Sequence, residues 1–456
     1  MPERHSSPRV VLTVMCVGYF LVLLDVTIVN VALPRLGDDL GTGVAGLQWV
    51  VDGYAVAFAS LLLASGAAGD RLGHRRIVLL GLTVFGLASA ACTMAPTPEV
   101  LIGARIAQGV GGALLLPGTL AVIADAYPDR QGQARAIGVW AGIGGLALPA
   151  GPLCGGLLVQ TAGWRAVFAI NLPIVLVAAI VAHRVVPGTS HRSTTPTDRL
   201  GTVLGVVLLS ATTLAVIEAG HAGLAPLTGI AAAVAALALG AFVVAERRSP
   251  HPMLPPALWR RPAFAAANVA AGVMNLGTLG MLFLLTAYLQ TVQDRNALQA
   301  GIAVLPLFLP LVVLGPLSGR LTARLGPRVP MLTGLVIAAA GFALICGWSA
   351  STTYARLFPA LLVWGIGLGV LTPAVVSAAV GAVEPGRSGL ASGVNNTARQ
   401  AGGAVGIALY GAVAGPAARP ATFISGLHAL AAVTAVAFVV AAAASTVLIP
   451  GRQAAS

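Results

Sequence analysis

The residues best suited to chemistry are the few ionisable side chains inside long apolar stretches. Asp25 lies about two-thirds of the way along the first stretch, and Arg105 lies at a comparable depth in the fourth. Asp52 lies nearer the same end of the second stretch. An arginine beside a buried carboxylate favours the charged carboxylate, so a movement that separates the pair favours proton uptake. These three residues form a candidate proton-binding set. A static ion pair, and for Asp52 a solvated helix end, are the alternatives.

Polar residues of the second half form a different group, because all but one are uncharged. This group could line a cavity for a small molecule, and it comprises Asn275, Gln290, Asn395, Asn396 and Arg399, with Asn30 of the first stretch assigned to it as well. Hydrogen bonding between helices is the alternative for each amide. Arg399 is harder to attribute to packing, because an unpaired cation near mid-span is costly in a bilayer. We expect it to face water or a partner.

The elements that must position these residues are membrane-spanning helices. Apolar residues make up 57% of the 456 residues and charged residues only 9%, against about 25% charged in soluble proteins. Helices need roughly 20 apolar residues to cross a bilayer. Hydropathy, charges and Pro/Gly clusters delimit fourteen such stretches: 10–34, 47–69, 77–95, 100–124, 134–160, 166–186, 200–219, 224–245, 263–290, 298–319, 329–348, 355–380, 388–413 and 421–449.

The arginines predict which ends of these helices face the cytoplasm. All 26 basic residues are arginine. If the N-terminus is cytoplasmic, nineteen fall in cytoplasmic segments, five outside and two within spans. Because cytoplasmic loops carry the excess of basic residues, we expect both termini to be cytoplasmic.

An internal repeat divides the chain into two related halves. The segment 66–75 recurs, loosely, at 319–328, and the segment 108–117 recurs at 364–373 with nearly the same offset. Two matches at one offset indicate duplication. The sequence therefore predicts an all-α polytopic membrane protein with a six-helix bundle at 1–187, a linker with two additional transmembrane helices at 188–262, and a second six-helix bundle at 263–456.

Small residues and prolines are concentrated in the fifth stretch. Gly151, Pro152, Gly155 and Gly156 lie there, with Pro149 just before them. Glycines permit close helix contact and prolines bend a helix. A bent, close-packed helix suits a rocking interface, although packing alone is the alternative.

Other function classes lack their usual signals. The arginines form no basic patch with interleaved aromatic residues, which argues against a nucleic-acid partner. The four cysteines lie in separate apolar stretches, so no metal site is expected. Without lysine the chain has no Walker-type phosphate loop, and it shows no nucleophile with a base beside it. We expect no cofactor and no enzymatic activity.

Taken together, these motifs resemble the major facilitator superfamily and, within it, the fourteen-span drug:proton antiporter family. The loop with Gly66, Asp70, Arg71, Gly73 and Arg75 resembles the superfamily's cytoplasmic loop after its second span, although His74 stands where an arginine is usual. The resemblance implies that this loop is a conformational latch. The segment around Asp25 resembles the family's first-span motif, and Arg105 belongs to a segment that resembles its proton-transfer motif. Gly151, Pro152, Gly155 and Gly156 resemble its antiporter motif.

The resemblance implies a proton-coupled exporter of amphipathic drugs, antibiotics or secreted metabolites, working by alternating access. Its partners would be the substrate, protons and the lipid bilayer of the plasma membrane, and one chain would form the complete pathway. An uncoupled facilitator or importer on the same fold is the alternative. A membrane-bound sensor or enzyme is the alternative from another class.

Overall fold

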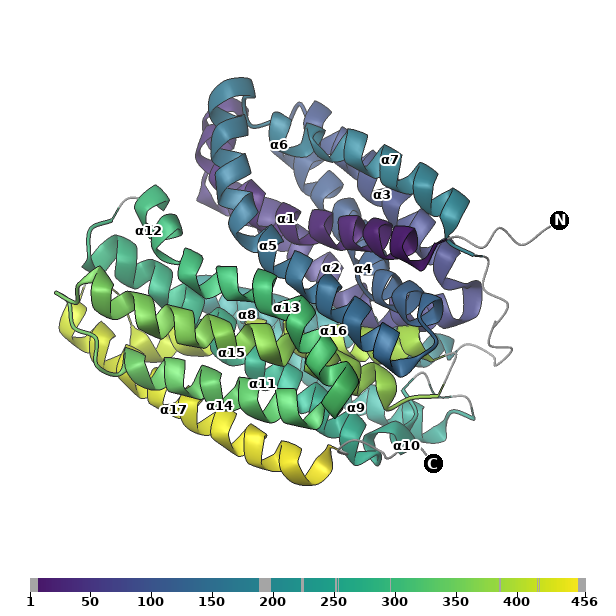
Figure 1. Ribbon diagram of the computed structural model, residues 1–456. Helices are drawn as coiled ribbons and strands as arrows, with labels where there is room; N and C mark the ends of the chain where they lie inside the picture. Colours follow the sequence, from purple (N-terminus) through teal and green to yellow (C-terminus); the bar gives the residue numbers. More distant parts are fainter. Residues whose placement is uncertain are drawn as a thin grey trace.

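The computed structural model describes residues 7–187, 198–222, 225–250, 252, 254–295, 297–384, 387–415, 417 and 419–449. Within these ranges the chain forms helices joined by short connections (Figure 1). Those of the first half are α1 (Pro8–Leu40), α2 (Val44–Leu72), α3 (His74–Met94), α4 (Pro98–Ala126), α5 (Arg130–Ala162), α6 (Ala166–Ala169) and α7 (Asn171–Val185). The middle of the chain forms α8 (Arg199–Ala222), α9 (Pro226–Arg248) and α10 (Pro256–Trp259). Those of the second half are α11 (Pro262–Ala287), the π-helix η1 (Tyr288–Val292), α12 (Ala297–Ala303), α13 (Leu305–Leu325), α14 (Arg328–Ile345), α15 (Tyr354–Gly381), α16 (Ser388–Ala414) and α17 (Pro420–Leu448).

The prediction of an all-α membrane protein is confirmed, whereas the count of fourteen spans is not. Among the described residues, 12 helices are long and apolar enough to cross a membrane, or up to 13 if the bent α5 is one span. Every predicted stretch contains a helix, but α16 is not among those that pass on apolarity. Its first half carries Asn395, Asn396 and Arg399, which lower its mean hydropathy.

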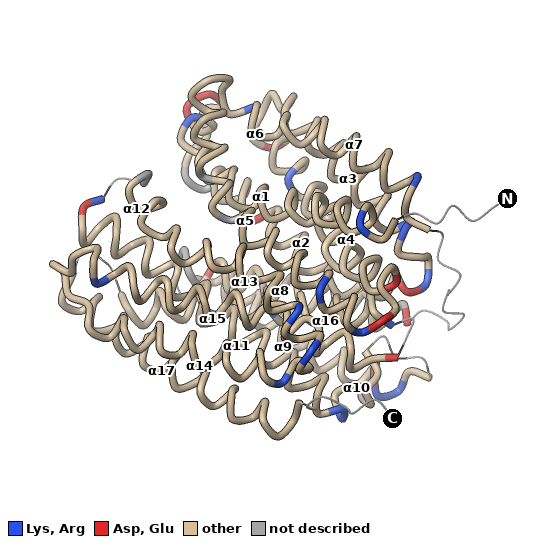
Figure 2. Tube along the Cα trace, viewed as in Figure 1, with Lys and Arg blue, Asp and Glu red and all other residues tan. Residues whose placement is uncertain are grey.

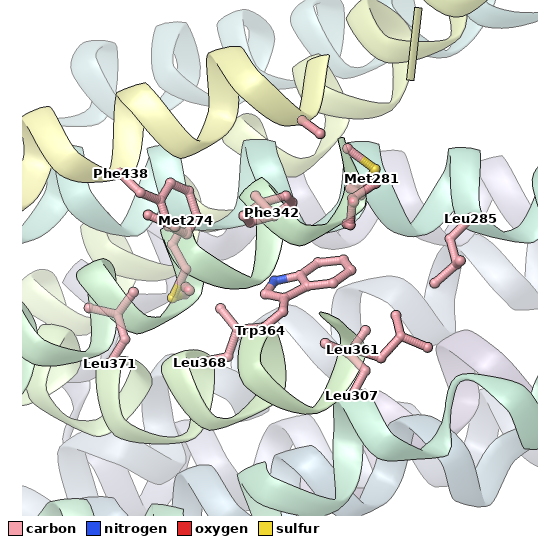
Figure 3. Packing of buried hydrophobic residues seen from close by; sticks show 14 of the residues in the cluster. Met274, Met281, Leu285, Leu307, Phe342, Leu361, Trp364, Leu368, Leu371 and Phe438 are labelled. Atoms are coloured by element: carbon pink, nitrogen blue, oxygen red, sulfur yellow. The ribbon is translucent and has the colours of Figure 1, made fainter. Parts of the chain in front are cut away.

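Two large cores of buried side chains lie in the two halves of the chain. Figure 3 shows the one in the second half, where Trp364 of α15 packs against Phe342 of α14 with ring centroids 4.7 Å apart. The ring of Phe438 of α17 meets Phe342 edge to face. In the first half the largest buried rings include Trp140 and Phe85. The boundaries at residues 187 and 262 stay a prediction.

The two halves meet through glycines of α5 and α13 and of α2 and α16. A Cβ atom added to Gly138 would lie 2.7 Å from the Cα atom of Gly319, and one added to Gly389 would lie 2.5 Å from the carbonyl oxygen of Gly66. Since no Cβ fits there, the helix backbones are in direct contact. Both contacts lie toward the end of the molecule at which α2 turns into α3, which we call the Asp70 end.

The contacts of the opposite end, which we call the Asp39 end, include a clasp within the first half. The indole nitrogen of Trp164 donates to Asp39 Oδ2 at 2.9 Å, and the guanidinium of Arg165 donates to the same atom at 2.6 Å. These bonds tie the end of α1 to the connection between α5 and α6.

The central helices α8 and α9 pack on each other, and α8 also contacts α2 and α16, one helix from each half. A small cavity lies among α2, α8 and α16, and its lining includes Thr212, Thr397 and Gln400. The connector that follows α9 is fixed to the second half by Arg261, which donates to Glu384 at 2.7 Å. This hydrogen bond and the charge of Arg261 lower the pKa of the Glu384 carboxyl.

Arginines are concentrated at one end of the molecule. Figure 2 shows most of them at the end where α1 begins and α17 ends, and fewer at the opposite end. The asymmetry agrees with the arginine count made on the sequence, and the assignment of that end to the cytoplasm stays a prediction.

Candidate functional site

Asp25 and Arg105 form a buried ion pair between α1 and α4. A guanidinium nitrogen of Arg105 donates to Asp25 Oδ2, and Asp25 is 0% and Arg105 1% exposed. Arg105 Nε also donates to the backbone carbonyl of Val50 at 3.0 Å. The structure therefore brings together two residues of the set proposed from the sequence.

Neutral side chains complete the hydrogen bonding around this pair. Gln108 Nε2 donates to Asp25 Oδ1 at 2.8 Å and to Ser89 Oγ at 3.0 Å, while its Oε1 accepts from Arg105 at 2.7 Å. Asn171 Nδ2 of α7 donates to Asp25 Oδ1 at 3.4 Å. We call Asp25, Ser89, Arg105, Gln108 and Asn171 the Asp25 network. Four helices contribute to it, and all its members are buried.

Aromatic rings cover the guanidinium of Arg105. The ring centroid of Tyr54 lies 4.3 Å from its central carbon and that of Phe168 lies 5.9 Å away. Cations over ring faces are stabilised electrostatically. Arg105 also donates to Gln108 Oε1 and to the carbonyl of Val50. Protonation of Asp25 would therefore not leave the cation without hydrogen bonds.

Asp52 and Asn30 lie outside the Asp25 network. Asp52 is partly exposed on α2. Asn30 is exposed on α1, where its amide donates to the backbone carbonyl of Val26 at 3.3 Å. The sequence assigned Asp52 to the proton-binding set and Asn30 to the group that could line a substrate cavity, and both assignments stay predictions.

Asp70 joins the two halves of the molecule. Its two carboxylate oxygens accept hydrogen bonds from the backbone N–H groups of Gly389 at 2.9 Å and Leu390 at 2.8 Å. These groups belong to the first turn of α16, where a helix leaves N–H groups free and carries partial positive charge. Asp70 therefore caps a helix of the opposite half, and its role as a conformational latch stays a prediction.

His74 lies between two carboxylates at this latch. Its Nε2 atom is 3.2 Å from Asp70 Oδ1 and 3.9 Å from Asp125 Oδ2 of α4. The side chain is buried. His74 therefore contacts Asp70 from the start of α3, while the backbone of α16 contacts it from the second half.

The remaining latch residues have different roles. Gly66 allows α16 to approach the α2 backbone. Gly73 adopts a φ of 94°, which L side chains rarely adopt, and makes the turn between α2 and α3 possible. Arg75 donates to the carbonyl of His183 at the end of α7, within the first half. Arg71 is partly buried in the last turn of α2.

The glycines of the antiporter motif pack α5 on α1. A Cβ atom at Gly151 would lie 2.9 Å from Ile28 N, and one at Gly155 would lie 3.0 Å from Ile28 O. Gly156 has open space at its Cβ position, and the side chain of Pro152 is outside the described part of the structure. The axis of α5 turns by 42° between Gly151 and Leu153.

Two of the second-half amides, Asn395 and Asn396, form hydrogen bonds within the second half. Asn395 donates to Asn268 Oδ1 of α11 at 3.3 Å, and Asn396 donates to Ser392 O one turn earlier at 2.9 Å. Both are buried. Asn275 is half-buried on α11, and Gln290 is exposed in η1.

Arg399 differs from these amides, since it reaches the first half. It is partly buried on α16, and its side chain lies near the hydroxyl of Tyr19 on α1. Its Nε atom is buried without a hydrogen-bond partner.

The proton-binding set predicted from the sequence did not include Ser89, Gln108 or Asn171, although Gln108 lies with Arg105 in the segment that resembles the family's proton-transfer motif. Gln108 could have been found, because it follows Arg105 by three residues and so shares its helix face. Ser89 gave no comparable signal. Among the described residues, no group of three or more His, Cys, Asp or Glu side chains is placed to hold a metal ion.

Comparisons with known proteins give one consistent result. The model of the family described as Major Facilitator Superfamily matches residues 15–407. The chain is 36% identical to a methylenomycin A resistance protein of Streptomyces coelicolor, over 90% of this chain and 86% of that one. It is 34% identical to a tetracenomycin C resistance and export protein of Streptomyces glaucescens, over 89% and 76% of the two chains.

Two further matches extend this result. The chain is 32% identical to the multidrug efflux pump LfrA of Mycolicibacterium smegmatis, over 90% of this chain and 82% of that one. The crystal structure of the human organic anion transporter MFSD10 superposes with a TM-score of 0.70 at 16% identity, covering 98% of this chain and 100% of the other. At that identity the superposition shows the fold alone.

Proposed function

Because the chain belongs to the major facilitator superfamily, we propose that it is a proton-coupled exporter that exchanges protons for amphipathic drugs, antibiotics or secreted metabolites by alternating access. The family and the efflux proteins among its relatives support export. The observation that carries proton coupling is the buried pair of Asp25 and Arg105. We place the protein in the plasma membrane with both termini cytoplasmic, acting as a single chain and as a transporter rather than an enzyme.

Proton binding at Asp25 would begin with loss of its bond to Arg105. A buried carboxylate without its cation favours the protonated form. Arg105 would keep Gln108 Oε1 and the carbonyl of Val50 as acceptors. Because leaving a buried donor unpaired costs about 1–3 kcal/mol, these acceptors lower the cost of releasing Asp25.

The Asp70 latch would be the element that responds to this change. In the structure Asp70 accepts hydrogen bonds from the first turn of α16, which would be the closed state of such a latch. Opening of the cytoplasmic end requires that Asp70 leave Gly389 and Leu390 and that the glycine contacts of α5 with α13 separate. Proton entry at an interior potential of −100 mV supplies about 2.3 kcal/mol per charge, which can drive this cycle without ATP.

The experiment that tests this function uses inverted membrane vesicles that are acidified inside and followed with a pH-sensitive dye. Transported compounds will release protons and reverse the dye quench, and Asp25→Asn will abolish the response. Asp38→Asn, the same change at an exposed site of α1, serves as the matched control and will keep it. Accumulation of substrate that persists without proton movement in both proteins would instead indicate a facilitator.

A further inference from the structure

Arg399 is a cation near the middle of the bundle, at the boundary between the two halves. It is the twelfth residue of α16, so it lies roughly 16 Å from the start of that helix at about 1.5 Å per residue. The cap of α16 by Asp70 lies at the Asp70 end, several turns away. Charged groups at such depth are costly unless they are neutralised or meet water.

The second half supplies no carboxylate inside its helices to neutralise Arg399. Residues 263–456 contain two acidic side chains, Asp294 and Glu384, and both lie in connections between helices. Glu384 is bound by Arg261 at 2.7 Å. In the first half the carboxylate of Asp25 is bound by Arg105 and that of Asp70 by the α16 backbone.

The side chain of the first half that lies near Arg399, Tyr19, is neutral and aromatic. Tyr19 stacks on Trp140 of α5 with ring centroids 3.8 Å apart. A Cβ atom at Gly144 would lie 2.6 Å from the Tyr19 hydroxyl oxygen, so α5 also borders this place. If the halves separated, Arg399 would leave Tyr19, and its guanidinium, whose Nε already lacks an acceptor, would face the space between them.

We propose that Arg399 binds the acidic group of the exported compound, and that the substrates are therefore amphipathic organic anions, carboxylates above all. This inference rests on the proposed exporter function and names the substrate class of that site. A guanidinium pairs with a carboxylate through two parallel hydrogen bonds. The ring of Tyr19 suits the apolar part of such a compound.

Charge movement across the membrane agrees with this assignment. With a negative cell interior, the outward movement of an anion and the inward movement of a proton are both favoured by the membrane potential. Exchange of one proton for a monovalent cation would instead move no net charge. The proposal therefore predicts that transport is electrogenic and becomes faster as the potential increases.

The test compares compounds that differ only in charge. In the inverted-vesicle assay, aromatic carboxylates such as 1-naphthylacetate are added beside their neutral amides, with ethidium as a cation. The carboxylates will release protons and the amides will not. Arg399→Gln will raise the carboxylate concentration for half-maximal response about tenfold or more, and Arg399→Lys will restore part of it. Arg356→Gln, the same change at an exposed arginine of α15, will have no effect.

The outcomes separate this inference from the function on which it rests. Proton release by ethidium but by none of the carboxylates, abolished in Asp25→Asn, would overturn the anion proposal and leave the exporter intact. A carboxylate response unchanged in Arg399→Gln would overturn the role of Arg399. Absence of any response in the wild-type protein would contradict the exporter itself. Monodisperse elution of each variant on size exclusion verifies that it is folded.

Discussion

At the scale of single residues, both oxygens of Asp25 are occupied, and this explains how a carboxylate can lie fully buried in a bilayer protein. Oδ2 accepts from Arg105, and Oδ1 accepts from Gln108 and Asn171. Gln108 links the two charged residues, because its amide nitrogen donates to Asp25 and its oxygen accepts from Arg105. The network thus offers the cation and the carboxylate a shared neutral partner.

Replacement of Gln108 by leucine will weaken this network. The variant leaves Asp25 Oδ1 with Asn171 alone and removes an acceptor from Arg105, which we expect to cost about 1–3 kcal/mol of stability. Thermal unfolding of the purified protein in detergent will show a lowered midpoint. Gln131→Leu at the exposed start of α5 is the matched control. An unchanged midpoint in Gln108→Leu would mean that the network contributes little to stability.

The sequence allowed the pairing of Asp25 with Arg105 to be predicted, because few charges lie in the spans and these two lie at similar depths. It did not allow Ser89 to be assigned, since a serine in an apolar helix commonly bonds a carbonyl of its own helix, and Ser89 also does this with Phe85 O at 2.8 Å. Asn171 is brought to Asp25 by the packing of α7, which hydropathy does not specify.

At the scale of helices, the features that matter are close backbone contacts and one polar span. Glycines put α5 in direct contact with α13, and α2 with α16, at the Asp70 end. The helix α16 carries the latch turn, Asn395 and Arg399, and so its apolarity is low. These polar residues account for the low apolarity of α16. Proline and glycine clusters did not predict the break between α12 and α13 or the π-helix η1.

A methyl group at the contact of α5 with α13 will prevent its closure. In Gly138→Ala the new Cβ atom would lie 2.6 Å from Gly315 O and 2.7 Å from Gly319 Cα, so the helices must move apart. We expect spin labels on the ends of α5 and α13 at the Asp70 end to show longer distances and transport to fall. Gly240→Ala on α9, where a Cβ meets open space, is the control. Unchanged distances in Gly138→Ala would contradict direct backbone contact.

At the scale of the whole molecule, two helical bundles are closed against each other at the Asp70 end, and the central pair packs at their side. The helix α8 contacts α2 and α16, so the pair is more than a spacer between the halves. The two-fold repeat predicts two bundles, and their bounds stay a prediction. The place of α8 and α9 was not predictable, because a helix exposed to lipid on one side carries no pattern that identifies its neighbours.

The arginine distribution predicts the orientation of the whole molecule. The end rich in arginine will be cytoplasmic, as basic residues are retained on that side. A fluorescent protein fused to the C-terminus will fold and fluoresce, while alkaline phosphatase fused there will be inactive because it requires the periplasm. A fusion after residue 295, in a segment assigned to the outside, will give the opposite pattern. Active phosphatase at the C-terminus would contradict the orientation.

The central claim is that Asp25 carries the proton that is exchanged for the substrate. The most direct measurement is proton release by the purified protein in weakly buffered detergent solution, followed with a pH indicator as a transported compound is added. The account predicts that substrate binding displaces about one proton per chain and that Asp25→Asn releases none while still binding the compound. Equal proton release by Asp25→Asn and wild-type protein would contradict it.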